Sequence, residues 1–142
     1  MKKFFLTLIT LIVLGAIALV ITTTVLNNKA AEDVEHTLSS MKMPADTECV
    51  SSVFATGKLT SDAAGMQYFG AIMIKSSLPE NTLKEYFKGY EVKPQKENKI
   101  EVLDRANLSF DVIPYTGVSY YIVYGWGNCD FPLRNLDFRN FG

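Results

Sequence analysis

The sequence predicts an α+β fold, in which an N-terminal transmembrane helix precedes a small antiparallel sheet of about five strands with one packed helix. Three observations lead to this prediction. Residues 4–26 form an apolar run without a charge, the chain beyond Cys49 is rich in β-branched and aromatic residues, and one amphipathic helical pattern interrupts that part. Roughly 116 residues follow the apolar run, which is enough for one domain.

Residues 4–26 would span about 34 Å as a helix, and a bilayer core is about 30 Å thick. Lys2 and Lys3 precede the run and an acidic stretch follows it, which places the N-terminus in the cytoplasm and the rest outside the cell membrane. This compact basic start is typical of bacterial membrane proteins. Two alternatives stay open at this point: a signal peptide cut after Ala18, and a buried helix of a soluble protein.

The predicted organisation has four parts: a cytoplasmic tail at 1–3, the transmembrane helix at 4–26, a juxtamembrane linker at 27–46, and an extracytoplasmic α+β domain at 47–142. Within the domain, strands and a helix are expected in the order β-β-α-β-β-β. Their ranges follow from alternating apolar residues, from turn residues and from a Ser-Leu-Pro-Glu helix start. The predicted elements are strands at 49–59 and 66–76, a helix at 78–89, and strands at 100–103, 108–115 and 118–126.

Composition and charge exclude several classes. A chain with 48% hydrophobic and 20% charged residues is not a disordered tail. From Asn27 onward it has 12 basic and 15 acidic residues, a net charge of −3 without a basic cluster. Phosphate contacts need clustered lysine and arginine, so nucleic acid is not an expected partner.

Cys49 and Cys129 are the only cysteines, and they flank the predicted strands. An even pair outside the membrane predicts a disulfide, with two free buried thiols as the alternative. No motif predicts a metal or another cofactor, because there is no Cys-x-x-Cys and the single histidine, His36, falls in the predicted linker. We therefore expect no catalytic constellation, although acidic residues at strand ends and in loops could pair by chance: Asp104, Asp111, Asp130 and Asp137.

Aromatic residues are dense in the last third of the chain. Tyr120, Tyr124 and Trp126 share one face of the strand predicted at 118–126. They form either an aromatic core or, with Arg134 and Arg139, a ligand-binding face. Both faces of this strand are apolar and one helix can cover only one of them. We therefore expect residues 131–141 to fold back over the other.

An apolar N-terminal helix followed by a small β-rich domain resembles type IV pilins and pseudopilins. Those proteins have a Gly-Phe-like processing site directly before the apolar stretch and a glutamate five residues into it. Here Lys3-Phe4-Phe5 opens the run, and the first acid is Glu32. The chain departs from the family at both motifs, so the resemblance is limited to layout.

The sequence predicts a single-pass membrane protein with a non-enzymatic extracytoplasmic domain that binds or scaffolds another component. Its expected partners are the lipid bilayer, through residues 4–26, and another envelope or membrane protein. Two alternatives remain: an enzyme that acts on envelope polymers with paired aspartates and an aromatic cleft, and a small accessory subunit whose membrane helix is its main contact surface.

Overall fold

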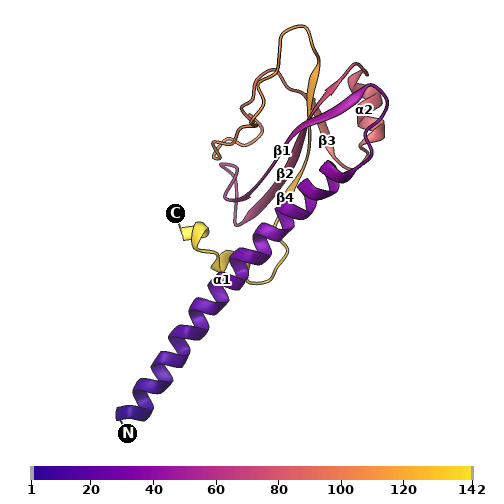
Figure 1. The fold of residues 1–142 in the computed structure, drawn as a ribbon. Coiled ribbons are helices and arrows are strands. Elements are labelled where there is room, and N and C mark those ends of the chain that lie inside the picture. The colour runs from indigo at the N-terminus through magenta and orange to yellow at the C-terminus, as the bar shows by residue number, and fades with distance from the viewer. Residues whose placement is uncertain (1, 142) are drawn as a thin grey trace.

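The computed structural model describes residues 2–141 (Figure 1). Two helices and four strands form a mixed α+β arrangement, followed by two short 3-10 helices near the C-terminus. Their bounds in chain order are α1 Lys2–Ser40, β1 Thr47–Gly57, β2 Gln67–Ser76, α2 Glu80–Tyr86, β3 Glu91–Pro94, β4 Tyr120–Asn128, η1 Arg134–Leu136 and η2 Phe138–Phe141.

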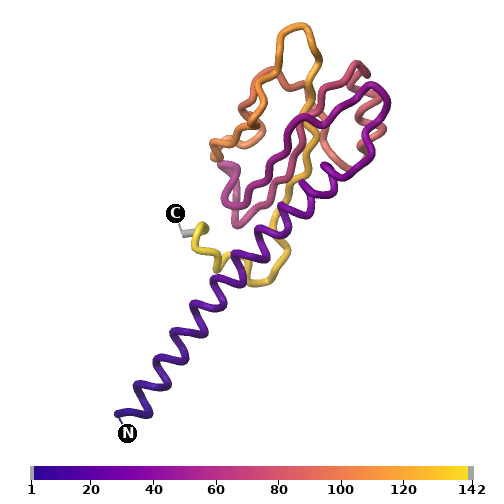
Figure 2. Tube along the Cα trace, viewed as in Figure 1, coloured from indigo at the N-terminus to yellow at the C-terminus, as the bar shows by residue number. Residues whose placement is uncertain are grey.

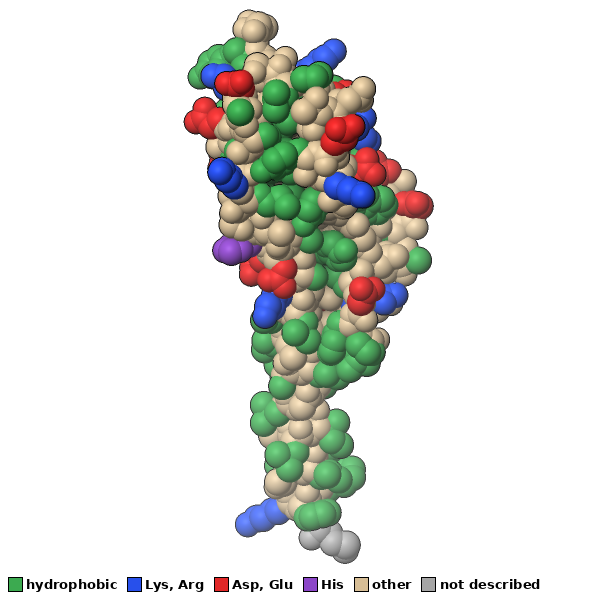
Figure 3. All heavy atoms as spheres, turned by 90° about the vertical axis from the view of Figure 1, so that its right-hand side faces the viewer, with side chains coloured by type: hydrophobic (Ala, Val, Ile, Leu, Met, Phe, Trp, Pro, Cys, Tyr) green, Lys and Arg blue, Asp and Glu red, His purple; other side chains and the backbone are tan. Residues whose placement is uncertain are grey.

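Helix α1 is one uninterrupted helix of 39 residues, about 58 Å long at 1.5 Å per residue. Its apolar half extends away from the sheet, and its second half lies along the sheet (Figures 1 and 2). The apolar half is long and apolar enough to cross a membrane, and its most apolar stretch of 18 residues is not buried in the protein. Figure 3 shows this half as a narrow column of mainly hydrophobic side chains below the domain. Most charged side chains lie on the domain and not on the column.

The linker expected at 27–46 is instead mostly helix. Residues 27–40 continue α1 without a break because they have a surface to pack on. Ala31 and Leu38 are fully buried there, and Val34 packs with Leu38 against the sheet. The sequence pattern at 29–46 looks polar because only this one face is apolar, and the opposite face, which carries His36, is exposed.

The four strands form one antiparallel sheet in the order β1-β2-β4-β3. The strands expected at 49–59, 66–76 and 118–126 are confirmed within two residues at each end, as β1, β2 and β4. β2 and β4 are central and pair along their whole lengths, for example Ile72 opposite Val123. Their near-continuous apolar sequences suit strands that are buried on both faces.

The strand count is four rather than five. Residues 100–103 and 108–115, expected to be strands, are irregular and are joined only by a single bridge between Lys99 and Ser109. β3 forms instead from the basic, proline-containing connection, where Val92 is the one buried residue. Apolar residues at 100–115 serve to cover the sheet, which requires hydrophobicity but no regular backbone.

Each face of the sheet has its own apolar core. On one face, Ile72, Ile74 and Val123 pack with α1, with Leu83 of α2 and with Phe87, the residue that follows α2. The other face is covered by residues 95–119, here called the cover segment. Its contribution to that core includes Ile100, Leu103 and Phe110, with Val102, Ala106, Leu108 and Val112 around them.

The C-terminal segment, residues 131–141, therefore does not cover the sheet as expected. It lies beside α1 on the side of the domain nearest the apolar half (Figures 1 and 2). The cover segment already occupies the open face of the sheet, so the C-terminal segment packs on the helix instead.

Two glycines allow α1 to approach the central strands closely. A Cβ atom on Gly70 of β2 would lie 2.6 Å from the backbone nitrogen of Glu35 and 2.8 Å from the carbonyl oxygen of Ala31. A Cβ atom on Gly125 of β4 would lie 3.0 Å from a methyl group of Val34. Glycine inside a strand marks such close backbone approach, and here it sets the distance between helix and sheet.

Candidate functional site

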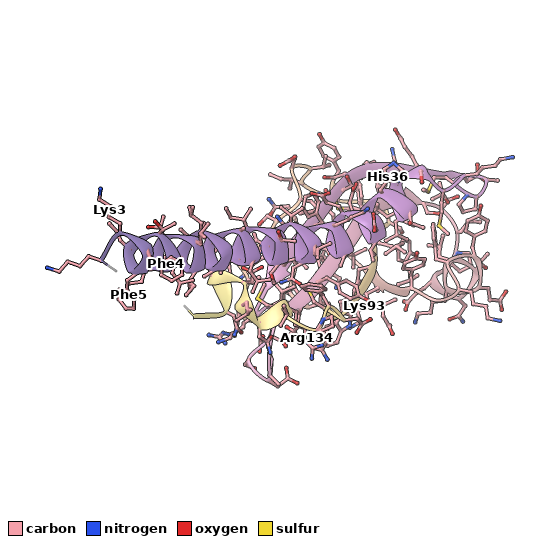
Figure 4. All side chains as sticks on the ribbon, turned by 90° about the horizontal axis from the view of Figure 1, so that it is seen from below. Lys3, Phe4, Phe5, His36, Lys93 and Arg134 are labelled. Atoms are coloured by element: carbon pink, nitrogen blue, oxygen red, sulfur yellow. The ribbon has the colours of Figure 1, made fainter. Side chains whose placement is uncertain are left out.

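The structure separates the five residues of the predicted ligand face. Tyr120 and Tyr124 are 5% and 4% exposed and belong to the core under the cover segment. Trp126, on the same strand, is 48% exposed. Arg134 and Arg139 lie in the C-terminal segment beside α1, as the label on Arg134 in Figure 4 shows. Of the aromatic strip, Trp126 alone presents a large area to solvent.

Trp126 lines a groove between α1, β4 and the turn before β3, here called the Trp126 groove. Its volume is about 490 Å³. Its lining combines aromatic residues with one acidic residue, Glu91, and most of the lining surface is polar; the lining residues are Val34, Tyr68, Gly89, Tyr90, Glu91, Tyr124, Gly125 and Trp126. Trp126 also lines two smaller hollows, of about 170 and 270 Å³.

The strand edge next to this groove is open. β3 pairs with β4 only from Pro94 opposite Tyr121 to Glu91 opposite Tyr124, so within residues 2–141 no strand lies beside residues 125–128 of β4 on that side. The amide of Gln95 donates to the carbonyl of Tyr120, which fixes the even-numbered residues of β4 as those whose backbone groups face this edge. Trp126 and Asn128 therefore direct their N–H and C=O groups outward, beside the Trp126 groove.

A second, larger hollow lies at the end of the sheet farthest from the apolar half of α1. It measures about 750 Å³ and is lined by residues 46–48, 75–77 and 117–119. Some of its polar groups are bonded to one another, for example the hydroxyls of Thr47 and Ser76 at 2.6 Å. Within residues 2–141, the buried side-chain atoms without a partner are elsewhere, on Asn27, Arg134 and Asn140. The lining of this hollow carries both signs of charge, from Asp46, Glu48 and Lys75.

The C-terminal segment is held on α1 by a buried polar cluster. Asn27 Nδ2 donates to Asp137 Oδ2 and to the carbonyl of Arg134, both at 3.0 Å. Arg139 donates Nε to Asp137 Oδ1 at 2.9 Å and pairs with Asp137 Oδ2 at 2.5 Å. Arg139 also donates to Asn28 Oδ1 at 2.8 Å and to the hydroxyl of Thr56. The cluster thus joins α1, the end of β1 and the C-terminus.

Asp137 is fully buried in this cluster. Burial disfavours the charged carboxylate, but the hydrogen bonds from Arg139 and Asn27 outweigh burial and lower the pKa of Asp137. Asp104 accepts hydrogen bonds from Ser61 N and Oγ at 2.8 and 2.5 Å, and these lower the pKa of Asp104. Both groups are thus stabilised as anions, whereas a general acid at neutral pH needs a raised pKa.

The predicted disulfide is wrong. Cys49 pairs in the sheet with Ile74, whereas the amide of Cys129 donates to the carbonyl of Met66, at the other end of β2. Eight residues of strand separate Ile74 from Met66, about 26 Å, and a disulfide needs Cα atoms within about 7 Å. Both cysteines are free. They flank the domain in sequence, but β2 holds their positions apart.

The two free thiols are expected to react slowly in the folded protein. Burial raises the pKa of Cys129 to about 11, and burial also raises the pKa of Cys49. At pH 8 only about one Cys129 thiol in a thousand is then the reactive thiolate. We expect no change in gel mobility on reduction, and slow alkylation of Cys129 by iodoacetamide until the protein is denatured. Electrophoresis with and without reductant measures the first, and peptide mass spectrometry after native alkylation measures the second. Rapid native alkylation at Cys129 would contradict the buried position.

Comparison of the chain with protein-family models, with curated proteins and with solved structures found no match. Among residues 2–141, no group of three or more His, Cys, Asp or Glu side chains is placed to hold a metal ion.

Proposed function

We propose that the protein is a single-pass membrane-anchored protein whose extracytoplasmic domain binds or scaffolds another envelope or membrane protein without catalysis. Residues 4–26 form the membrane span, the N-terminus with Lys2 and Lys3 is cytoplasmic, and the domain lies outside. Partner binding is proposed at the Trp126 groove and the adjoining open edge of β4.

The observation that carries this proposal is the division of α1 into two halves. The first half exposes large apolar residues all round, including Phe4, Leu11 and Ile21, and the domain covers none of its most apolar stretch. A helix that is hydrophobic on every side needs an apolar environment, and its length matches a bilayer. The second half is part of the domain core, so the proposed anchor and the domain form one rigid body.

The open edge of β4 indicates the chemistry of the partner. Outward N–H and C=O groups at Trp126 and Asn128 repeat at the spacing of a strand, and only another polypeptide backbone supplies acceptors and donors at that spacing. The exposed Trp126 side chain offers apolar area for a side chain of that strand, and the mostly polar groove beside it offers hydrogen-bonding groups. The proposed ligand is therefore an extended segment of about four residues that continues the line of β3.

Site-specific photo-crosslinking tests this function in intact membranes. A photoreactive residue in place of Trp126 should give a discrete adduct with one protein, and the same residue in place of exposed Ile113 on the cover segment should not. Adding Asn128→Pro removes one outward N–H, while the ladder to β2 uses the odd-numbered residues. We expect this variant to reduce the adduct several-fold. Equal crosslinking from both positions, or an adduct unaffected by the proline, would contradict binding at this edge.

A further inference from the structure

The C-terminal segment lies at a defined height along the proposed anchor. Its contact with α1 centres on Asn27, and Thr23, one turn earlier on the same face, is fully buried as well. From Phe4 to Thr23 the helix rises about 29 Å, close to the thickness of a hydrocarbon core. If Phe4 marks the inner boundary of the hydrocarbon, the segment meets the helix at the outer boundary, in the layer of lipid headgroups.

The side chains of this segment suit such a layer. Phe138 and Leu133 are 62% and 42% exposed, although both are large and apolar. The guanidinium of Arg139 lies 5.8 Å from the centre of the Phe138 ring. Aromatic and arginine side chains are favourable at membrane interfaces, where one end of the side chain contacts acyl chains and the other stays polar.

The charges of the segment agree with this location. Asp137, its one acidic residue, is buried against Arg139 and Asn27 and is withdrawn from the surface. Arg134 remains as a net positive charge, and Figure 4 shows it beside α1. The segment therefore presents apolar groups and a positive charge while it buries its negative one, as a surface that contacts lipid phosphates would.

We propose that the C-terminal segment is a second membrane contact, with Phe138 and Leu133 in the boundary between headgroups and acyl chains of the outer leaflet. The proposal rests on the proposed function, since it needs residues 4–26 to span the bilayer. The buried cluster of Asn27, Asp137 and Arg139 then positions this contact at a fixed height on the anchor.

Tryptophan fluorescence of the full chain in vesicles tests the contact. The variant Phe138→Trp is made in a Trp126→Phe background, so that the introduced ring is the only tryptophan, because the chain has one. The vesicles contain phosphatidylcholine and phosphatidylglycerol, with bromine at a shallow or a deep acyl position. Ile113→Trp in the same background is the matched control, since Ile113 is also exposed but lies on the cover segment.

We expect shallow bromines to quench the fluorescence of the Phe138→Trp variant at least twofold more than deep ones. Aqueous acrylamide should quench this variant several-fold less than the Ile113→Trp control. Equal quenching of the two variants by acrylamide, without quenching of Phe138→Trp by bromine, would overturn the lipid contact. Shielding of the introduced ring from both quenchers would show that a second copy or the protein itself covers it, which also overturns the contact.

Flotation of the same vesicles in alkali separates the two proposals. Protein that floats while the tryptophan of the Phe138→Trp variant stays accessible to acrylamide overturns the lipid contact and leaves the anchor intact. Protein that does not float overturns the anchor, and the lipid contact with it.

Discussion

Gly70→Val is expected to destabilise the domain by about 3 kcal/mol, toward the upper end of overpacking substitutions. The added Cβ would lie 2.6 Å from the amide nitrogen of Glu35 and 2.8 Å from the carbonyl oxygen of Ala31. These are backbone atoms of a regular helix and cannot rotate away as a side chain can. Helix α1 must therefore move off β2, which opens the core around Leu38 and Ile72.

The glycines of the two central strands provide matched controls for this prediction. In an alanine series, we expect Gly70→Ala to be the most harmful, Gly125→Ala intermediate and Gly127→Ala the mildest. Gly125 faces side chains of Val34 and Tyr90, and Gly127 faces the hydroxyl end of Tyr68, which can turn aside. Thermal unfolding of the full chain in detergent measures the order. Equal effects at all three positions would contradict the close contact between α1 and β2.

Asp137→Ala is expected to cost about 2 to 3 kcal/mol and to detach the C-terminal segment from α1. Removing one partner of a buried ion pair typically costs about 3 to 5 kcal/mol, because the other partner stays buried without compensation. The lower range applies here since the Arg139 side chain is 25% exposed and water can partly solvate it. Asp130→Ala is the control, because Asp130 is exposed just before the segment. Hydrogen exchange of residues 131–141 measures detachment, and unchanged protection would contradict the role of the cluster.

The same carboxylate makes the stability of the domain depend on pH, with lower stability at acidic pH. The pKa of Asp137 is lower in the folded protein than in the unfolded chain, so its contribution to stability is complete above the unfolded pKa of about 3.9. The contribution is lost as the pH falls through the folded pKa. In Asp137→Asn this part of the acid dependence should disappear, and the segment should remain weakly bound at every pH. Thermal unfolding between pH 2 and pH 7 measures the difference between the two proteins.

The central part of the fold could be predicted because local sequence and tertiary environment agree there. β2 and β4 are apolar on both faces and contain many aromatic or β-branched residues, and central strands of a two-sided core need this pattern. β3 could not be recognised, because an edge strand with one buried residue, Val92, leaves almost no pattern. In the cover segment, strands were predicted where the backbone is irregular, because hydrophobic residues such as Ile100 and Phe110 indicate burial and not backbone conformation.

The candidate site could be predicted only in part, for a similar reason. Trp126 stands out in the sequence, but the open strand edge beside it depends on β3 beginning opposite Tyr124, which no local pattern specifies. The polar cluster joins Asn27 to Asp137 across 110 residues. The adjacent Asn27 and Asn28 at the end of the apolar run are a signal for its helical side, and nothing in the sequence identifies their partners.

The continuity of α1 has a consequence for how the proposed anchor and the domain turn together. Each residue of a helix rotates its successor by about 100°, and α1 has no hinge between Phe4 and Ser40. The rotation of the apolar half about the helix axis is therefore fixed relative to the Trp126 groove and to the C-terminal segment. A bilayer too thin for residues 4–26 would tilt the helix. Because the helix continues into the domain, the domain would tilt with it, and the open edge of β4 would move toward or away from the membrane surface.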